Sequence, residues 1–301
     1  MNKKVLSREK RRKNTACLML MPAVIFIALL IAYPLCTVLV NAFRHKNLIN
    51  DAVGGWAGLA NYQKIFADEI FPKAVKNTFI WTIACVAGEY LIGMISAVLL
   101  NQKFRGRAVY RTLIFIPWCV PIVVAALVWD WMLNANFGVV NYLLTTLNLV
   151  DKPIQFLGDK NIAMLSVIFI NIWRSFPYYT ISFLAVLQGI SQDVVEASAI
   201  DGANCVQRFF KVILPQMKSI SLVLVFLHII WTAINFDFIW ILTEGGPNYA
   251  TETIPLMIYR YSMKSFDVGA ASALSTLIMG FMLVLFVFYQ RQRNKISESM
   301  L

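Results

Sequence analysis

Apolar residues are gathered into long blocks along this chain, and polar residues mark the breaks between them. A bilayer core about 30 Å thick is crossed by about 20 helical residues, and six blocks reach that length with few charges. Runs such as IPWCVPIVVAALVW do not alternate, so helices are expected and not the strands of a β-barrel. The pattern predicts an all-α membrane protein with spans at residues 15–43, 75–100, 111–133, 162–187, 220–242 and 268–289.

Composition agrees with that prediction. Hydrophobic residues make up 59% of the 301 residues and charged residues 14%, whereas an ordinary soluble domain has about 45 to 50% and about 25%. The formal net charge of +11 does not indicate nucleic-acid binding, because the basic residues lie between apolar blocks and form no continuous face with interleaved aromatic residues. The five cysteines form no CxxC pair, so neither a disulfide nor a metal centre is expected.

The distribution of charge predicts the orientation. The first block is about twice as long as the apolar part of a secretory signal, so it is expected to remain as a span. An even number of spans places both termini on one side. With the basic tail inside, the interior segments, counted with Arg111 at the edge of the third span, carry 17 Lys and Arg residues. The external segments, counted with Lys76 at the edge of the second span, carry 9, so both termini are predicted to be cytoplasmic. The expected organisation is a cytoplasmic tail (1–14), a membrane domain (15–290) and a second tail (291–301).

Several kinds of catalytic site lack their motif in this sequence. There is no GxxxxGK[ST] or GxGxxG loop to cradle a nucleotide, so the chain is not expected to hydrolyse ATP alone or to be an enzyme. Its two histidines, His45 and His228, do not have HExxH spacing, and no GxSxG turn presents a serine nucleophile. His228 is expected to be packed or to face a pore.

The segment 189–218, between the fourth and fifth spans, reads GISQDVVEASAIDGANCVQRFFKVILPQMK. Its apolar spacing predicts two short amphipathic helices joined by a turn at Gly202. Asp193 is expected to cap the first helix, with Glu196 completing a capping box. Pro215 is expected to start the fifth span, where its missing N–H costs little. The apolar face that needs a partner is expected to comprise Val195, Ile200, Phe209 and Phe210.

This segment resembles the EAA loop of bacterial importer permeases, whose pattern is E-A-A, three residues, G, nine residues, I-x-L-P. The spacing from Glu196 to Pro215 agrees throughout, and Ser198 and Val212 replace the second alanine and the isoleucine. Other stretches resemble the carbohydrate-uptake branch of this family, the permeases of the maltose and glycerol-3-phosphate type. They include WAGLANYQKIF from Trp56 and NFDFIWILTEGGPNYATET from Asn235.

The resemblance implies a permease subunit of the bacterial inner membrane. It implies a loop that docks into a separate ATPase, which binds the ATP and Mg²⁺, while this chain binds no cofactor. The implied complex holds a second related permease or a second copy of this chain, two ATPase subunits and an external solute-binding protein. Without the resemblance, Glu196 would be only a helix cap and Gly202 only a turn. The implied coupling residues are Glu196, Ala197, Ser198, Asp201, Gly202, Leu214 and Pro215.

Ionisable groups inside spans are costly and therefore functional candidates. Glu89 and Arg174 are predicted to lie at a similar depth, roughly 20 Å at 1.5 Å per residue, where they could form a buried pair. Prolines at 117, 121 and 177 are expected to kink their helices.

Sugars are bound by aromatic faces together with amides and carboxylates. An aromatic belt and hydrogen bonds between helices are the simpler explanation of the same residues. The candidates for a sugar pathway are Trp129, Asp130, Asn171, Arg174, Tyr178, Tyr179, Asn235, Phe236 and Asp237.

The external segment TEGGPNYATET, from Thr243, contains many turn-forming residues and could be a plain turn. The family resemblance implies that such a segment meets the solute-binding protein, here through Gly245, Gly246 and Pro247.

Two other classes remain open at this stage. An ion- or proton-coupled transporter could use Glu89 or Asp237 as a relay. A membrane enzyme would need paired catalytic groups, and Glu89 with Arg174 supplies no nucleophile. The sequence leaves the substrate open among disaccharides, oligosaccharides and glycerol phosphate.

Overall fold

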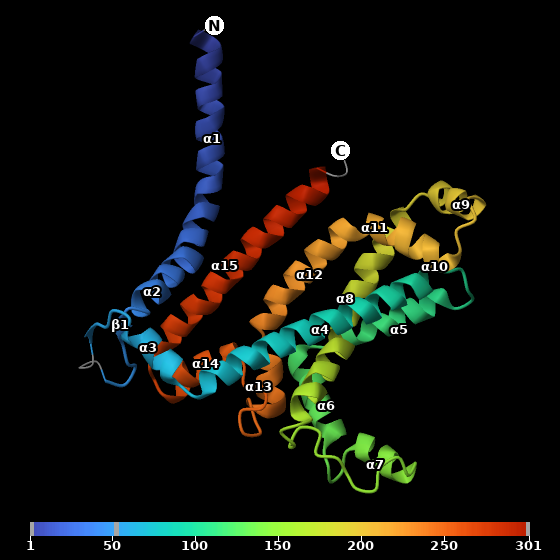
Figure 1. The fold of residues 1–301 in the computed structure, drawn as a ribbon. Helices are drawn as coiled ribbons and strands as arrows, with labels where there is room; N and C mark the ends of the chain where they lie inside the picture. Colours follow the sequence, from blue (N-terminus) through green and yellow to red (C-terminus); the bar gives the residue numbers. More distant parts are fainter. Residues whose placement is uncertain (1–2, 51–53, 299–301) are drawn as a thin grey trace. The chain divides into compact units, whose positions relative to one another are not determined.

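The structure is a computed structural model that describes residues 3–50 and 54–298, and its regular structure is almost entirely helical (Figure 1). The chain divides into two compact units, residues 1–67 with 258–279 and residues 68–257 with 280–301. The predicted tails, 1–14 and 291–301, lie partly outside the described residues. Their described parts are helical and belong to α1 (Lys3–Ile27) and α15 (Val268–Glu298).

The first unit begins with one unbroken helical stretch. It consists of α1, a π-helical turn (Ala28–Ala32) and α2 (Tyr33–Asn41). Residues 12–36 are exposed and largely apolar from Leu18 onward, so this surface suits hydrocarbon and not water.

The chain then turns back through a short antiparallel hairpin, β1 (Arg44–His45) and β2 (Gly55–Trp56), into α3 (Ala60–Ala67). The buried amide of Asn61 donates to the backbone oxygens of Ala42 and Arg44 at 2.9 and 3.0 Å. Lys64 pairs with Asp267, just before α15, at 2.6 Å. Backbone bonds from Leu48 N–H to Phe266 O at 2.9 Å and from Gly269 N–H to Lys46 O at 3.1 Å join the same two segments, so hydrogen bonds and an ion pair together hold this unit.

The second unit is built on two long helices that run in the same direction, α4 (Ile70–Asn101) and α8 (Ala163–Gly189), and pack along much of their length. Gly93 allows the close approach, because a Cβ atom there would lie 2.4 Å from Cβ of Tyr179. The helices that pack against this pair include α5 (Arg107–Cys119), α6 (Ile122–Leu133) and α12 (Lys218–Ala233).

Short helices connect these long elements. After α6 comes α7 (Val139–Thr146), and α12 is followed by α13 (Asp237–Thr243) and α14 (Ile254–Tyr259). A π-helical turn (Arg260–Lys264) precedes α15. The segment between α8 and α12 contains α9 (Gln192–Ile200), α10 (Cys205–Arg208), a π-helical turn (Phe209–Ile213) and α11 (Leu214–Gln216).

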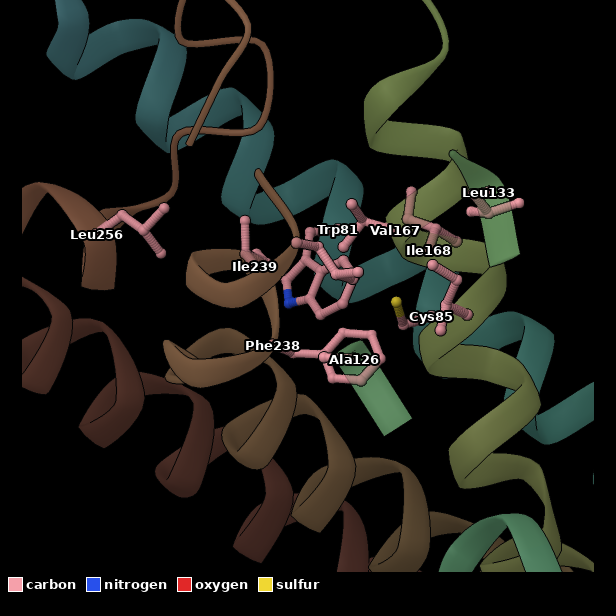
Figure 2. Close-up of a cluster of buried hydrophobic side chains, with 11 residues drawn as sticks. Trp81, Cys85, Ala126, Leu133, Val167, Ile168, Phe238, Ile239 and Leu256 are labelled. Carbon is pink, nitrogen blue, oxygen red and sulfur yellow. The ribbon is translucent and has the colours of Figure 1, made fainter. Parts of the chain in front are cut away.

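The core of the second unit consists of two apolar clusters. The first gathers Trp81 and Cys85 of α4 with side chains of α6, α8 and α13 (Figure 2). The second lies toward the α9–α11 segment and includes Met94, Tyr179 and Met217. Both clusters use α4 and α8, so these two helices form the centre of the unit.

Within the described residues, three helical stretches are long and apolar enough to span a membrane: Arg12–Asn41, Ile70–Asn101 and Val268–Ile296. Two bent pairs raise that number to as many as five. The predicted fourth span corresponds to α8, which is not among these long apolar stretches. Polar residues such as Asn171 and Arg174 lie near its middle, and they lower its apolar character.

Two predicted spans are not single straight helices. The third is broken between α5 and α6, which meet at 94°. The break falls at Pro121, whereas Pro117 and Pro177 lie inside continuous helices. The fifth ends at Ala233, and the chain resumes a helix only at Asp237. At its other end the start is Lys218 and not Pro215, with a 68° bend from the preceding helices.

Candidate functional site

The first helix of the segment between α8 and α12 begins differently from the prediction. The N-cap of α9 is Ser191, and no side chain caps the helix. Asp193 lies inside the first turn, where its carboxylate accepts from Ser191 Oγ at 3.4 Å. The predicted capping box of Asp193 and Glu196 is therefore wrong. Glu196 and Ala197 are exposed on α9, and Ser198 Oγ donates to the backbone oxygen of Val195 at 2.7 Å.

The turn after α9 lies at Gly202, as the sequence predicts. Gly202 has φ +80°, its N–H donates to Ala199 O at 3.1 Å, and Ala203 N–H donates to Ser198 O at 3.1 Å. These two bonds form a Schellman motif with Asp201 at the C-cap and glycine in the left-handed position. Glycine is thus required at this position by its backbone conformation and not by lack of space, because a Cβ atom there would meet nothing within 4 Å.

A capping box does exist, one helix further along. The Asn204 side chain accepts from Gln207 N at 2.8 Å, and Gln207 Oε1 accepts from Asn204 N at 3.0 Å. The sequence pattern, asparagine followed three residues later by glutamine, carries this signal. Leu214 then packs onto the second apolar cluster, and Pro215 is exposed in the first turn of α11.

The segment has an exposed apolar face, but its members differ in part from the prediction. Val195 and Phe209 are half-buried, and Phe209 packs against the second apolar cluster. Ile200 is 86% exposed and Phe210 60%. We define the apolar docking face as the exposed residues Val194, Ile200, Val206 and Phe210.

The base of this segment is held by two arginines that sequence reasoning did not single out. With the Gln188 amide oriented by its hydrogen-bond partners, its oxygen accepts from Arg111 Nη2 at 2.5 Å and from Arg107 Nη2 at 2.9 Å. Gln188 belongs to the last turn of α8, and both arginines belong to α5. Cations are stabilising at the negative, C-terminal end of a helix. This contact therefore fixes the position at which α8 ends and the chain continues into α9.

Deeper in the second unit, one carboxylate joins three helices. Glu89 of α4 is fully buried; its Oε1 accepts from Asn171 Nδ2 of α8 at 2.9 Å, and its Oε2 lies 2.7 Å from His228 Nδ1 of α12. The predicted ion pair of Glu89 with Arg174 is not the contact found, because Asn171, one turn before Arg174, faces the carboxylate. His228 is packed, as expected.

Aromatic rings surround His228. Its ring lies 5.0 Å from that of Tyr178, 4.5 Å from Tyr179 and 5.3 Å from Trp231. Trp118 of α5 stacks on Tyr178 at 6.0 Å. Tyr179 is fully buried, whereas Trp118 and Trp231 are exposed. We call Trp118, Tyr178 and Trp231 the aromatic row; its two tryptophans were not among the predicted pathway residues.

The other predicted pathway residues are scattered. Trp129 packs edge-on against Trp173 at 5.3 Å, and the adjacent Asp130 is exposed. Phe236 stacks on Trp240 at 5.4 Å, and Asp237 is exposed at the start of α13. Asn235 accepts from the backbone N–H of Phe238 at 3.2 Å.

The segment from Thr243 is more ordered than a plain turn. Gly245 is buried at φ +87°, and a Cβ atom there would lie 2.2 Å from Oε2 of the fully buried Glu252. Thr251 Oγ1 donates to Gly246 O at 2.8 Å, and Asn77 Nδ2 of α4 donates to Glu252 O at 2.9 Å. Gly245 therefore shapes the loop from inside and presents no surface.

Next to it lies a cleft of about 360 Å³ lined by Gln155, Gly158, Asp159, Lys160, Pro247 and Asn248. Of the three predicted contact residues, Pro247 is thus the one that borders a concave surface. Within residues 3–50 and 54–298, no group of three or more His, Cys, Asp or Glu side chains is placed to hold a metal ion.

Residues 89–298 match the family described as binding-protein-dependent transport system inner membrane component. The chain is 32% identical to the trehalose/maltose transport system permease protein MalF of Thermococcus litoralis, over 89% of this chain and 90% of that protein. It is 30% identical to the sulfoquinovosyl glycerol transport system permease protein SmoG of Agrobacterium fabrum, over 92% and 89%.

A crystal structure of a bacterial ABC transporter involved in the import of the acidic polysaccharide alginate has a similar fold. A chain of that structure matches with a TM-score of 0.84 and 22% identity, covering 97% of this chain and 99% of that one.

Proposed function

This chain belongs to the family of binding-protein-dependent transport system inner membrane components, and from that premise we propose that it is the membrane subunit of an ATP-driven carbohydrate importer. It forms part of the sugar pathway, and its energy comes from separate ATPase subunits that bind ATP and Mg²⁺. Relatives named for trehalose, maltose and sulfoquinovosyl glycerol support a carbohydrate as the class of substrate.

The observation that carries the proposal is the apolar docking face on a turn of fixed geometry. Val194, Ile200, Val206 and Phe210 leave apolar surface uncovered on a segment between two long helices, and such surface marks a site of protein contact. The ATPase covers this face. Glu196 supplies a charged contact there, and Gly202 sets the angle between α9 and α10.

Movement of this segment reaches the pathway through its two ends. At one end Gln188 joins it to α8 and to the arginines of α5. At the other, α11 leads through buried Met217 into α12. Closure of the ATPase therefore tilts both helices and alternates the access of the pathway between the two sides.

The aromatic row is the part of the pathway best suited to a sugar. The residues of the row come from three helices. Trp118 and Trp231 are exposed and both contact the half-buried Tyr178, and exposed aromatic rings are what proteins use to cover the C–H surface of a sugar ring. Asp130 and Asp237 supply exposed carboxylates. The amide of Asn171 is already used by Glu89.

Six crossings with both termini inside complete the proposal. The crossings are α1 with α2, α4, α5 with α6, α8, α12 with α13, and α15. The partner permease is a related chain or a second copy, and the cleft beside Pro247 meets the external solute-binding protein. Accessibility of tags at the two termini tests the orientation, because tags on opposite sides of sealed vesicles exclude an even number of crossings.

The decisive experiment replaces Glu196 by Lys and Gly202 by Asp in the assembled complex. Both variants are expected to insert normally but to lose sugar uptake and sugar-stimulated ATP hydrolysis. Glu298→Lys, an exposed charge reversal in α15, is the control and should transport normally. Wild-type uptake in both loop variants would refute the coupling role.

An ion-coupled secondary transporter is the alternative, and it is not favoured. Its proposed relay Glu89 is fully buried and paired, and Asp237 is exposed at a helix start. Removing ATP from vesicles should stop uptake by the complex, whereas an uncoupler should leave uptake unchanged if ATP is kept constant. The opposite pair of results would establish the alternative.

A further inference from the structure

Glu89 and His228 form a buried contact, which together with Asn171 we call the junction. Sugar binding by the aromatic row does not require this contact. Glu89 has no exposed surface, and His228 and Asn171 are each 5% exposed. One carboxylate thus accepts from α8 and faces the imidazole of α12. With Glu89 as acceptor, His228 Nδ1 carries the proton, and its buried Nε2 has no partner among the described residues.

This junction lies within a series of polar contacts that hold α12 against α4. Tyr90 OH and Ser221 Oγ lie 3.2 Å apart near one end of α12. Trp81 Nε1 donates to Thr232 O at 2.9 Å near the other. His228 falls between Ser221 and Thr232. The series fixes the register of α12 along α4, and the junction extends it to α8.

Helix α12 directly follows the segment that carries the apolar docking face. Met217 is fully buried at the bend between α11 and α12, and its N–H donates to Ile213 O and Leu214 O at 3.3 and 3.1 Å. Ser221 N–H in turn donates to Met217 O at 2.9 Å. Backbone bonds therefore continue through the bend, so a push on the segment displaces α12.

What α12 then does depends on its contacts with α4. Apolar helix surfaces can slide past one another in small shear movements. A buried carboxylate cannot lose its hydrogen-bond partners without a large penalty, because no water replaces them. The junction therefore converts sliding of α12 into joint movement of α12, α4 and α8.

We propose that Glu89 and His228 are positioning residues that make α4, α8 and α12 move as one body when the docking face is displaced, and so keep sugar movement coupled to ATP hydrolysis. This inference rests on the proposed function of the chain. Neither residue has to touch the sugar, and their contribution is mechanical.

The test measures ATP hydrolysed per sugar transported by the complete complex in lipid vesicles. Glu89→Leu and His228→Leu keep bulk but abolish the junction. ATP hydrolysis should continue while uptake falls, so that the ratio rises about tenfold, within the usual range of coupling between sites. Thr180→Val is the matched control. Thr180 is equally buried on α8, but its hydroxyl donates to Phe176 O of its own helix, and its ratio should stay at the wild-type value.

Conservative replacements separate positioning from mere stability. His228→Asn places an N–H donor close to the position of Nδ1 and should restore the wild-type ratio. His228→Gln carries the same amide one methylene further out, so it cannot meet Glu89 without displacing it, and its ratio should be raised. This pair also decides the matter if a leucine variant does not assemble.

Each outcome has a definite meaning. A wild-type ratio in both leucine variants, or equal ratios for His228→Asn and His228→Gln, overturns the inference and leaves the proposed function standing. Wild-type uptake that persists without ATP overturns the proposed function itself, and the inference with it.

Discussion

The indole nitrogen of Trp81 donates to the backbone oxygen of Thr232 at 2.9 Å, joining residues 151 positions apart. Trp81 is fully buried in the cluster shown in Figure 2, and Thr232 lies in the last turn of α12. Carbonyls in the last turn of a helix lack their usual donors four residues on, and Thr232 O also accepts from the N–H of Asn235, just after the helix, at 3.2 Å. The indole therefore serves both as apolar core and as a donor at the end of a broken span.

Replacing Trp81 by Phe tests this double role. An aromatic ring is retained but the indole donor is lost. Thr232 O then keeps its backbone bond from Asn235, and the loss of one hydrogen bond costs about 0.5 to 1.5 kcal/mol. The unfolding temperature of the purified complex in detergent should fall. Trp131→Phe, at a position 58% exposed, should leave it unchanged. Equal unfolding temperatures for the two variants would contradict the assignment.

Two glycines of α4 should respond differently to the same substitution. A Cβ atom at Gly93 would lie 2.4 Å from Tyr179 Cβ and 3.1 Å from backbone atoms of α8, which cannot move separately. At Gly88 the nearest atom, at 2.3 Å, is Cδ1 of Ile172, the end of a flexible side chain. Gly93→Ala should cost about 1 to 3 kcal/mol and Gly88→Ala clearly less. Denaturation of the two purified variants measures the difference, and a reversed order would contradict the packing account.

Gly202 offers a test of backbone conformation without steric interference. Alanine in the left-handed region costs about 1 to 2 kcal/mol, whereas asparagine adopts that region more readily. Gly202→Ala should therefore lower sugar-stimulated ATP hydrolysis by the complex, and Gly202→Asn should lower it less. If alanine and glycine support equal rates, the Schellman turn is not required for coupling.

Gly245 allows the external loop to be tested separately. Its φ of +87° and the Glu252 oxygen beside it leave no room for a methyl group. Gly245→Ala should abolish stimulation of ATP hydrolysis by the binding protein while leaving the basal rate intact. Gly280→Ala, a glycine in α15 with open space around it, should be indistinguishable from wild type. Normal stimulation in Gly245→Ala would show that a methyl group at this position does not disturb the contact of the loop with the binding protein.

Local signals in the sequence predicted local structure well. The turn at Gly202 and the bend at Pro121 lie where glycine and proline indicate them. The segment 189–218 holds two capping-box signals of the same spacing, Asp193 with Glu196 and Asn204 with Gln207. Only the second forms a capping box, and the spacing alone does not distinguish them. The gap between α12 and α13 has neither glycine nor proline; there Asn235 bonds the backbone of Phe238, which competes with continued helix.

Contacts between helices could be predicted only in part. Counting residues gives depth along a helix, and it placed Glu89 near Arg174. It does not give the direction in which a side chain points. Asn171 lies about one turn away and faces Glu89, and His228 comes from a helix whose start and tilt depend on the bend at Met217. The apolar block predicted helix α8, but only the structure shows that its polar residues are accommodated by packing on α4.

The polar character of α8 has a consequence for how the chain is assembled as it leaves the ribosome. A helix that carries Asn171 and Arg174 partitions poorly into lipid by itself. Because α4 is synthesised first, the carboxylate that accepts from Asn171 is already in place when α8 arrives, together with the glycine surface on which α8 packs. Insertion of α8 should therefore depend on the helix made before it, which supplies both a hydrogen-bond partner and a packing surface for the newly made segment.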